Sequence, residues 1–408
     1  MKLTKIDLVQ SPDSQGKIRL IGEVHYFDST EPEYYWFEVD QKYRAQVSTS
    51  GNLWLVLLLP LAVTLGEPLE ICAPVDPRLL RNMHEVMRIW RSWYPELQSV
   101  PIKARTRKNV LHGKRKVASF FSGGVDSFST VLRYEKALNK NTPYEISDLI
   151  NVWGFDVPLK NHNAYSMMRE SYLKAAGKLH KNLIDIKTNV RELRWKQANW
   201  AFLSHSCALV SVALLLEKRF QKVLIASTGG YHDLQPWASH VLIDPKLSST
   251  NLEIVHDGAE MRRMRKTEIV CKSPVALEHL HVCWLHGSNS NCSECLKCYR
   301  TMLALDLYGK LDESITFDKT KYSLDKVAKM FVDDYYDRRY MEEILDAAYK
   351  HGRIDIAHAI ERSFRHTQLL KKLLPLSRNV RDVMRNRRFV WRWAYTLENA
   401  LLAKSIYE

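Results

Sequence analysis

The sequence predicts an α/β protein built on a doubly wound parallel β-sheet with helices on both faces. From residue 117 to residue 226, short apolar segments alternate with segments of helical periodicity, an order that is typical of a covered parallel sheet. The predicted strands are Val117–Phe121, Leu149–Val152, Asn182–Ile186 and Val223–Ala226. The predicted helices are a segment that begins at Phe128, Met167–His180 and the strongly apolar Trp200–Phe220.

A smaller α+β unit is predicted ahead of this sheet, in residues 1–100. Two segments rich in β-branched and aromatic residues, Ile18–Phe27 and Tyr34–Val39, flank a Ser-Thr-Glu-Pro turn and predict a hairpin. The other predicted elements are a helix from Leu53 to near Gly66, a strand at Leu69–Pro74 and a helix at Pro77–Trp93. Pro101 and the basic stretch as far as Lys116 then predict a linker.

The chain after Cys298 is predicted to be helical. The segments with helical spacing are Ser323–Tyr335, Tyr340–Lys350, Ile354–Arg365 and Val380–Trp393. The predicted organisation is therefore an accessory unit at 1–100, a central domain at 114–305 and a basic helical region at 306–408. A chain of 408 residues has room for two or three domains.

Composition and charge predict a globular protein with an anionic partner. Hydrophobic residues make up 46% of the chain and charged residues 26%, which excludes a mainly disordered protein. The net charge of +14 predicts contact with a nucleotide, a nucleic acid or an acidic protein, without distinguishing among them. The positive charge is unevenly distributed along the chain. Seven Lys or Arg and no acidic residue lie between Lys103 and Lys116, and thirteen Lys or Arg and only four acidic residues lie between Lys350 and Lys404.

The chain is expected to be cytoplasmic, without a secretory signal or a membrane span. The most apolar run, Leu53–Leu65, contains Pro60 and is shorter than the roughly 20 residues that a membrane span needs. A core helix is the better interpretation of this run. In a reducing compartment the seven cysteines are more often metal ligands or core thiols than disulfide partners.

A glycine-rich turn, Ser122-Gly123-Gly124-Val125-Asp126-Ser127, lies between a predicted strand and a predicted helix. Glycines allow a sharp turn and a close approach of the backbone to a ligand, and the helix start offers N–H groups that suit a phosphate. Asp126 would repel a phosphate unless it faces Mg²⁺ or orients the loop. The alternative is a turn that only joins a strand to a helix.

Four cysteines, Cys283, Cys292, Cys295 and Cys298, have the spacing C-x8-C-x2-C-x2-C. Four thiolates within sixteen residues can surround one Zn²⁺ tetrahedrally, and scattered core cysteines would not fall at this spacing. A [4Fe–4S] cluster is the alternative, because a C-x2-C-x2-C run with a distant fourth cysteine also suits it. The remaining cysteines, Cys72, Cys207 and Cys271, are expected to be core thiols.

The glycine-rich turn resembles the PP-loop of the N-type ATP pyrophosphatases, a family that includes QueC. Lys266-Thr267-Glu268-Ile269-Val270 resembles the later K-x-E-[IV] element of that family, and the cysteine spacing resembles the zinc site of QueC. The resemblance covers about Lys114–Leu305. It implies a Rossmann-like, adenine nucleotide alpha hydrolase-like fold, cleavage of ATP between the α and β phosphates, transfer of AMP to a substrate oxygen, and displacement by a nucleophile. Ser122, Gly123, Gly124, Val125, Asp126 and Ser127 would then bind ATP, Asp126 would hold Mg²⁺, Lys266 would reach the phosphates, and the zinc would be structural.

Two further loops are candidates for binding the ligands. The resemblance places the adenosine near Phe155, after the second predicted strand. The loop after the fourth predicted strand should face the ATP, because ligands of doubly wound folds bind beyond the carboxyl ends of strands. Its candidate substrate-binding residues are Tyr231, Asp233, Trp237 and His240. Asp233 and His240 could each serve as a base or a ligand, although a single loop residue of either type is more often an ordinary loop side chain.

The chain is longer than QueC at both ends, and in this it resembles the extended QueC-like proteins of anti-phage systems, the QatC component of Qat systems and the QueC-like member of type IV CBASS. For that group the resemblance implies activation of 7-carboxy-7-deazaguanine with ATP and transfer to a protein N-terminal amine rather than to ammonia. For this chain the expected acceptor is ammonia or the N-terminus of a partner protein. It also implies a C–N ligase in antiviral defence and a possible homodimer.

Two alternatives are a PP-loop enzyme that modifies tRNA and a catalytically silent nucleotide-binding subunit of a defence complex. The first would bind RNA through the basic C-terminal helices, where cations and aromatic rings alternate. The residues concerned are Arg385, Arg387, Arg388, Trp391, Arg392 and Trp393. A solvated face over an apolar stripe explains the same residues.

Overall fold

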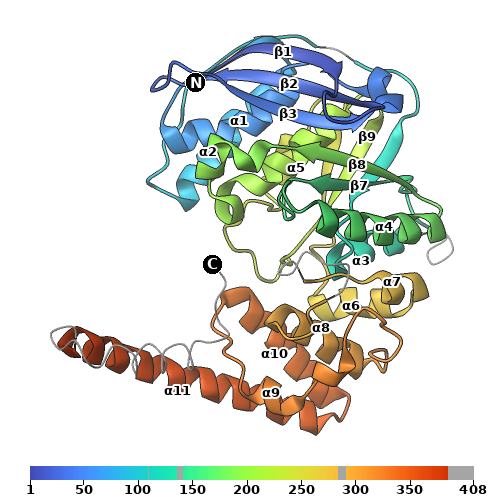
Figure 1. Cartoon of the computed structure of the whole chain (residues 1–408), viewed down its shortest axis with the longest axis vertical. Helices are drawn as coiled ribbons and strands as arrows, with labels where there is room; N and C mark the ends of the chain where they lie inside the picture. Colours follow the sequence, from blue (N-terminus) through green and yellow to red (C-terminus); the bar gives the residue numbers. More distant parts are fainter. Residues whose placement is uncertain (109, 136–140, 284–290, 385–408) are drawn as a thin grey trace. The chain divides into compact units, whose positions relative to one another are not determined.

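The computed structural model describes residues 1–108, 110–135, 141–283 and 291–384, with side chains described as far as residue 372 (Figure 1). The described residues form two compact units, of which the first is Met1–Arg262 and the second begins at Arg263. The predicted Arg and Trp residues of 385–393 lie outside the described part of the chain. The boundaries predicted at 100, 114 and 305 differ from this division, because the first hundred residues belong to the same sheet as the predicted central domain.

The first unit contains a sheet of ten described strands, in the order β10-β9-β6-β7-β8-β3-β2-β1-β4-β5. Pairing is parallel from β10 to β8 and again from β1 through β4 to β5, and it is antiparallel from β8 through β3 and β2 to β1. The strands are β1 (Lys2–Gln10), β2 (Lys17–His25), β3 (Glu33–Asp40), β4 (Leu69–Val75), β5 (Ile102–Thr106), β6 (Lys116–Phe120), β7 (Asp148–Trp153), β8 (Asn182–Thr188), β9 (Phe220–Ala226) and β10 (Glu253–Asp257).

Helices cover both faces of the strands β6 to β9, which confirms the predicted α/β class. On one face Ala118 and Phe120 of β6 join the core made with α1 (Asn52–Leu65), α2 (Pro77–Trp93) and α5 (His205–Leu215). On the other face Phe121 contacts Phe128 and Tyr172 edge to face, with ring centroids 4.9 and 5.5 Å apart. These two residues belong to α3 (Val125–Arg133) and α4 (His162–Lys178). The alternation along β6 is what two covered faces require.

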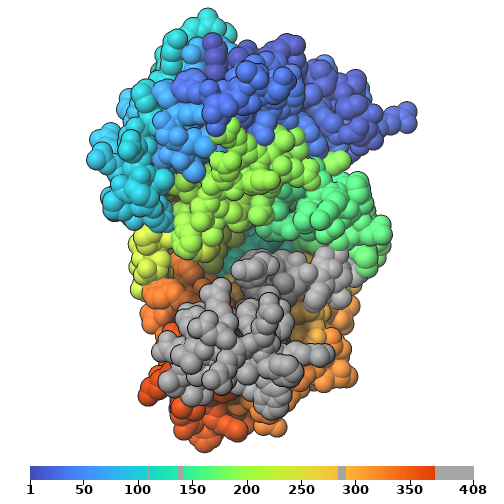
Figure 2. Space-filling view, turned by 60° about the vertical axis from the view of Figure 1, so that its left-hand side comes forward, coloured from blue at the N-terminus to red at the C-terminus, as the bar shows by residue number. Residues whose placement is uncertain are grey.

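The first hundred residues extend this sheet and share its core, so they do not form a separate unit. The predicted hairpin is confirmed as β2 and β3, and β3 pairs with β8. The Thr188 hydroxyl donates to the Trp36 carbonyl at 2.7 Å, and the Trp36 amide donates to Asn189 Oδ1 at 2.9 Å. In Figure 1 β1 to β3 continue the sheet of β7 to β9, and in Figure 2 the surface from blue to green is unbroken. A hydrophobic pattern indicates strands but not which strands pair, so the sequence could not reveal this junction.

The basic stretch after Pro101 is not only a linker, because it begins with the edge strand β5. Lys103 in this strand is exposed, and a charged side chain on an edge strand discourages pairing with another chain. The same charges interrupt the hydrophobic pattern by which a strand is predicted. The strands β1 and β10 were also not predicted, since β1 mixes polar and half-buried residues and β10 has five residues.

The predicted core helix is confirmed: α1 is buried from Asn52 to Val63 and ends at Gly66, whose φ is +68°. The indole of Trp54 on this helix leaves no room on β2 for a side chain at Gly22, where a Cβ would lie 2.5 Å from the ring. None of the described helices combines the length and the apolar character that crossing a membrane requires.

The second unit is helical in most of its described residues. Its helices are α6 (Arg263–Cys271), α7 (Pro274–His279), α8 (Leu296–Leu307), α9 (Leu324–Ala328), α10 (Tyr335–Lys350) and α11 (Ile354–Met384). The predicted helix at Ser323–Tyr335 is wrong for most of its length, because only α9 forms there before the chain turns at 329–334. The predicted helices at Tyr340–Lys350 and Ile354–Arg365 lie within α10 and α11.

Candidate functional site

The glycine-rich turn leaves the carboxyl end of β6 and enters α3. Gly123 has a φ of +69°, a conformation that favours glycine, and Gly124 occupies the N-cap of α3. Gly124 has no side chain that could cap the helix, so the first-turn N–H groups, which lack intrahelical acceptors, can donate to a ligand. Asp126 and Ser127 lie in this first turn, and Asp126 is partly buried. The turn therefore has the backbone arrangement that binds an anion.

Hydrogen bonds fix the shape of this turn. The Ser127 hydroxyl donates to the Gly124 carbonyl at 3.0 Å, and the Ser122 amide donates to Ser127 Oγ at 3.4 Å. The hydroxyl of Tyr172 on α4 donates to the Ser122 carbonyl at 2.6 Å. Burial, and to a lesser degree the Asp156 carboxylate, raise the pKa of Tyr172, so this phenol remains a donor. Tyr172 was not predicted, because its only signal in the sequence is its place on the buried side of a predicted helix.

The loop after β9 emerges at the same edge of the sheet, because β9 and β6 are parallel neighbours. Ser227 follows β9, and its amide donates to the Asp257 carbonyl at 2.8 Å. The Tyr231 amide donates to the Ala259 carbonyl at 2.7 Å, and Tyr231 is 59% exposed. Asp233 is partly buried, and its amide donates to the Gly230 carbonyl. Tyr231 and Asp233 thus lie on a loop that flanks the glycine turn.

His240, farther along this loop, is buried and packs edge to face on Trp93 with centroids 4.8 Å apart. Its Nδ1 accepts a bond from the Leu242 amide at 3.1 Å. Burial and the neighbouring His256 lower the pKa of His240, so its imidazole is neutral at pH 7. These contacts describe a histidine that shapes the loop. Trp237 is partly buried and meets Phe202 edge to face at 5.2 Å.

Phe155 follows β7 at the next strand of the same edge, and it is buried. Its ring lies 5.3 Å from the ring of Trp200, and its carbonyl accepts a bond from Arg191 Nη1 at 2.6 Å. Gly154 has a φ of +107°, and a Cβ there would lie 1.9 Å from the Thr188 carbonyl oxygen. Arg191, just after β8, was not singled out from the sequence, where one more arginine in a basic chain carries no distinguishing signal.

Lys266 belongs to the second unit, on α6, and it is almost fully buried. Its neighbour Arg265 is exposed and pairs with Glu268, which also pairs with Lys272. The K-x-E element is thus a helix with a buried lysine and an exposed charged face. The Ser122–Ser127 turn, Phe155 and the loop after β9 belong to the first unit.

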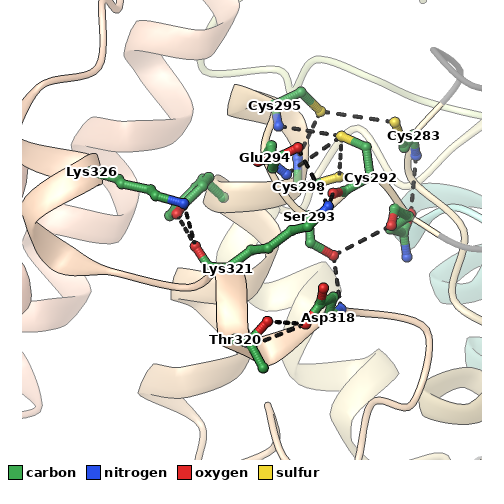
Figure 3. A network of polar contacts seen from close by, with 12 residues as sticks. Cys283, Cys292, Ser293, Glu294, Cys295, Cys298, Asp318, Thr320, Lys321 and Lys326 are labelled. Carbon is green, nitrogen blue, oxygen red and sulfur yellow. Dashed lines mark hydrogen bonds and ion pairs between the residues drawn. The ribbon is translucent and has the colours of Figure 1, made fainter.

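The four predicted cysteines come together in the second unit, with all four Sγ atoms within 4.8 Å of one another (Figure 3). The Sγ atoms of Cys292 and Cys298 are 3.7 Å apart, and those of Cys283 and Cys295 are 4.0 Å apart. A tetrahedral zinc ion with Zn–S bonds of about 2.3 Å holds its sulfurs about 3.8 Å apart. The four cysteines could therefore hold a metal ion such as zinc.

Backbone amides point at the sulfurs, as metal-bound thiolates require. The Cys295 amide donates to Cys292 Sγ at 3.3 Å, and the Cys298 amide donates to Cys295 Sγ at 3.4 Å at the start of α8. Ser293 makes this turn possible with a φ of +60°. Asn291 Oδ1 accepts from the amides of Val282 and Cys283, which joins the first cysteine to the other three. Ser293 and Asn291 were not predicted, because polar residues between cysteines show no periodic pattern.

The crowding of the thiols favours a cation. The neighbouring Cys283 raises the pKa of Cys295 to about 11, and the adjoining thiols raise the pKa of Cys298 as well. Several thiolates at this separation repel one another, so all four ionise together only around a positive ion.

Comparison of the chain with protein-family models, with curated proteins and with solved structures finds no match.

Proposed function

We propose that the chain is a QueC-like PP-loop enzyme that uses ATP to activate a carboxylate of the 7-carboxy-7-deazaguanine type. The reaction forms an acyl-adenylate and releases pyrophosphate. An amine then displaces AMP and leaves an amide. The proposed amine is ammonia or the N-terminus of a partner protein, and the proposed setting is bacterial anti-phage defence, as the resemblance implies.

The observation that carries the proposal is the position of the glycine turn in the sheet. The turn joins β6 to α3 at the carboxyl edge of the sheet. From β6 the chain adds β7 and β8 on one side, and it then adds β9 and β10 on the other side. Numbered along the chain, the strands from β6 to β10 stand in the order 5-4-1-2-3, that of a doubly wound nucleotide-binding sheet read from its other edge. Ligands of such sheets bind at this reversal of strand order, so a Rossmann-like fold is part of the proposal.

The residues of the turn have distinct proposed roles. The N–H groups at the start of α3 and the hydroxyls of Ser122 and Ser127 hold the departing pyrophosphate. Asp126 would hold Mg²⁺, which when bound offsets negative charge on the leaving phosphates. A single, partly buried carboxylate beside an anion site fits an ion that also takes oxygen ligands from phosphates. The resemblance alone assigns Lys266 to the phosphates. Its burial is consistent with an ammonium group that has a specific role, because lysines are rarely buried without one.

We further propose that the cysteine cluster binds one structural zinc ion. An iron–sulfur cubane stands between its ligand sulfurs and holds them farther apart than a single ion does. The sulfur separations of 3.7 and 4.0 Å therefore favour a single ion. Four cysteine ligands leave no open position for a substrate, which favours a structural role.

The test is release of pyrophosphate by the full chain incubated with ATP, Mg²⁺, 7-carboxy-7-deazaguanine and ammonium. Release should require the carboxylate, and Asp126→Asn should slow it by roughly a hundredfold, the scale for removing one transition-state charge contact. The matched control is Asp7→Asn, which removes an exposed carboxylate from β1. Release only on addition of tRNA would favour the tRNA-modifying alternative. No release under any of these conditions would favour the silent subunit.

A further inference from the structure

Arg191 differs from the other partly buried arginines of the first unit in what surrounds its charge. Among the residues that the structure describes, it has one hydrogen-bond acceptor, the Phe155 carbonyl at 2.6 Å, and no carboxylate at ion-pair distance. Its guanidinium lies over the ring of Trp200, 4.3 Å from the centroid. Burial lowers the pKa of Arg191, which the exposed Asp156 only partly offsets.

The comparison with its neighbours shows that this arrangement is uncommon in the fold. Other arginines of the unit have acidic partners: Arg19 with Glu38, Arg133 with Glu260, Arg194 with Asp28 and Arg219 with Asp148. Arg115 instead donates to three carbonyls, those of Glu217, Phe220 and Asn251. Arg191 is only partly buried, so its remaining donors are accessible, and a planar guanidinium with free donors and no acidic partner suits an anionic ligand.

The aromatic residues beside Arg191 are presented by a π-helical turn, Trp200–Ser204, at the start of α5. Such turns are rare and occur frequently at functional sites. Three successive carbonyls of this turn accept bonds from outside it: Trp200 from His205 Nδ1, Ala201 from the Ala238 amide and Phe202 from the Tyr94 hydroxyl. The turn is therefore held by the residue that follows it and by two segments from elsewhere in the chain.

The rings around this turn offer partly exposed aromatic surface. Phe202 is 46% exposed, Trp200 and Trp237 are partly buried, and His205 lies 5.8 and 6.1 Å from their ring centroids. With Nδ1 donating to the Trp200 carbonyl, a neutral His205 carries its acceptor on Nε2. Burial lowers the pKa of His205 and so favours this neutral form. We call Arg191, Trp200, Phe202, His205 and Trp237 the Arg191 platform.

We propose that the Arg191 platform binds a planar heteroaromatic carboxylate, with its ring against the aromatic side chains and its carboxylate on the Arg191 guanidinium. This inference rests on the proposed function, because it assigns a site to the molecule whose carboxylate receives AMP. Arg191 follows β8, two strands from β6, and two strand spacings amount to about 10 Å. Because β6, β7 and β8 are parallel, the platform lies along the same carboxyl edge of the sheet as the glycine turn.

The experiment is a titration of the full chain with 7-carboxy-7-deazaguanine in the absence of ATP, followed by calorimetry or tryptophan fluorescence. The wild-type protein should bind the probe, and Arg191→Gln should weaken binding by roughly thirtyfold, as expected for loss of a desolvated charge pair. Lys196→Gln is the matched control, because it removes one exposed positive charge from the next turn and should leave the affinity unchanged. In the pyrophosphate assay Arg191→Gln should raise the KM for the carboxylate more than it lowers kcat.

Arg191→Lys gives a second test if the glutamine variant does not fold. It keeps the charge but not the planar fork, and it should also weaken binding. Absence of probe binding, or equal binding by wild type and both variants, would overturn the inference. Probe binding that depends on Arg191, without pyrophosphate release, would support the Arg191 platform and contradict the proposed reaction. Pyrophosphate release that is unaffected by Arg191→Gln would contradict the platform and support the reaction.

Discussion

The glycine turn of the first unit and the cysteine cluster of the second are held in shape by different means. The turn lies between a strand and a helix that pack on the rings of Phe121, Phe128 and Tyr172, and one tyrosine hydroxyl fixes its backbone. The four cysteines bring sulfurs to within 3.7 Å, where their ionised forms repel. The apolar core and a hydrogen bond therefore set the shape of the turn, whereas we expect the cluster to need a cation for its full stability.

The largest effect should come from removing one sulfur ligand. Cys298→Ser should abolish binding of the metal and lose a contribution on the order of 10 kcal/mol, the scale of structural zinc sites. Metal analysis of the purified protein and thermal unfolding would measure both effects. The first unit should keep its own unfolding transition, because its core contains no cluster residue.

Cys72→Ser is the matched control for this change. Cys72 is a partly buried thiol on β4, outside the cluster. Its replacement should leave the metal content at one ion per chain. Equal metal content in Cys298→Ser and the wild type would contradict the assignment of the cluster, and broad visible absorption with bound iron would contradict zinc.

A smaller effect should follow from Gly123→Ala. Alanine at a φ of +69° costs roughly 1–2 kcal/mol of conformational free energy, or else the turn changes shape. Pyrophosphate release should fall sharply while the metal content stays at the wild-type value. Gly66→Ala is a close control, because Gly66 has a φ of +68° and a Cβ added there would meet no atom within 4 Å. A parallel loss of activity in both variants would show that strain at any glycine, and not the turn itself, explains the result.

The smallest predicted effect is a dependence of stability on pH through His205. Burial lowers the pKa of this imidazole below its usual value of about 6.5, so the unfolded chain takes up a proton first as the pH falls. The contribution is fully present above pH about 6.5 and decreases as the pH falls through the folded-state pKa. Thermal unfolding at pH 7.5 and 5.5 should show a smaller pH dependence for His205→Asn than for the wild type. An identical dependence in both proteins would contradict this role.

The glycine turn and the cysteine cluster also show which parts of the structure could be predicted from the sequence. The strands Val117–Phe121 and Leu149–Val152 and the glycine turn are encoded locally, by short apolar runs and residues with special backbone freedom, so their positions were predicted closely. The cysteine cluster was also predicted, because three of its ligands lie within seven residues. Pairing of β3 with β8 depends on contacts between residues about 150 positions apart, for which a single sequence carries no local signal.

Supporting residues were harder to predict than the residues they support. Tyr172 acts through a contact with a backbone carbonyl group, to which any donor of suitable length can bond. Asn291 does the same for the cysteine cluster, through two amides. A sequence motif identifies the residues expected to contact a ligand. The residues that support the motif depend on the folded geometry, so a single sequence does not reveal them.

Binding of α,β-methylene-ATP, which cannot be split between its α and β phosphates, tests the central claim most directly. In the presence of Mg²⁺ the full chain should bind one molecule of this analogue, and Gly123→Ala should weaken binding while Gly66→Ala should not. Failure of the wild-type protein to bind, or equal binding by all three proteins, would contradict a nucleotide site at the glycine turn.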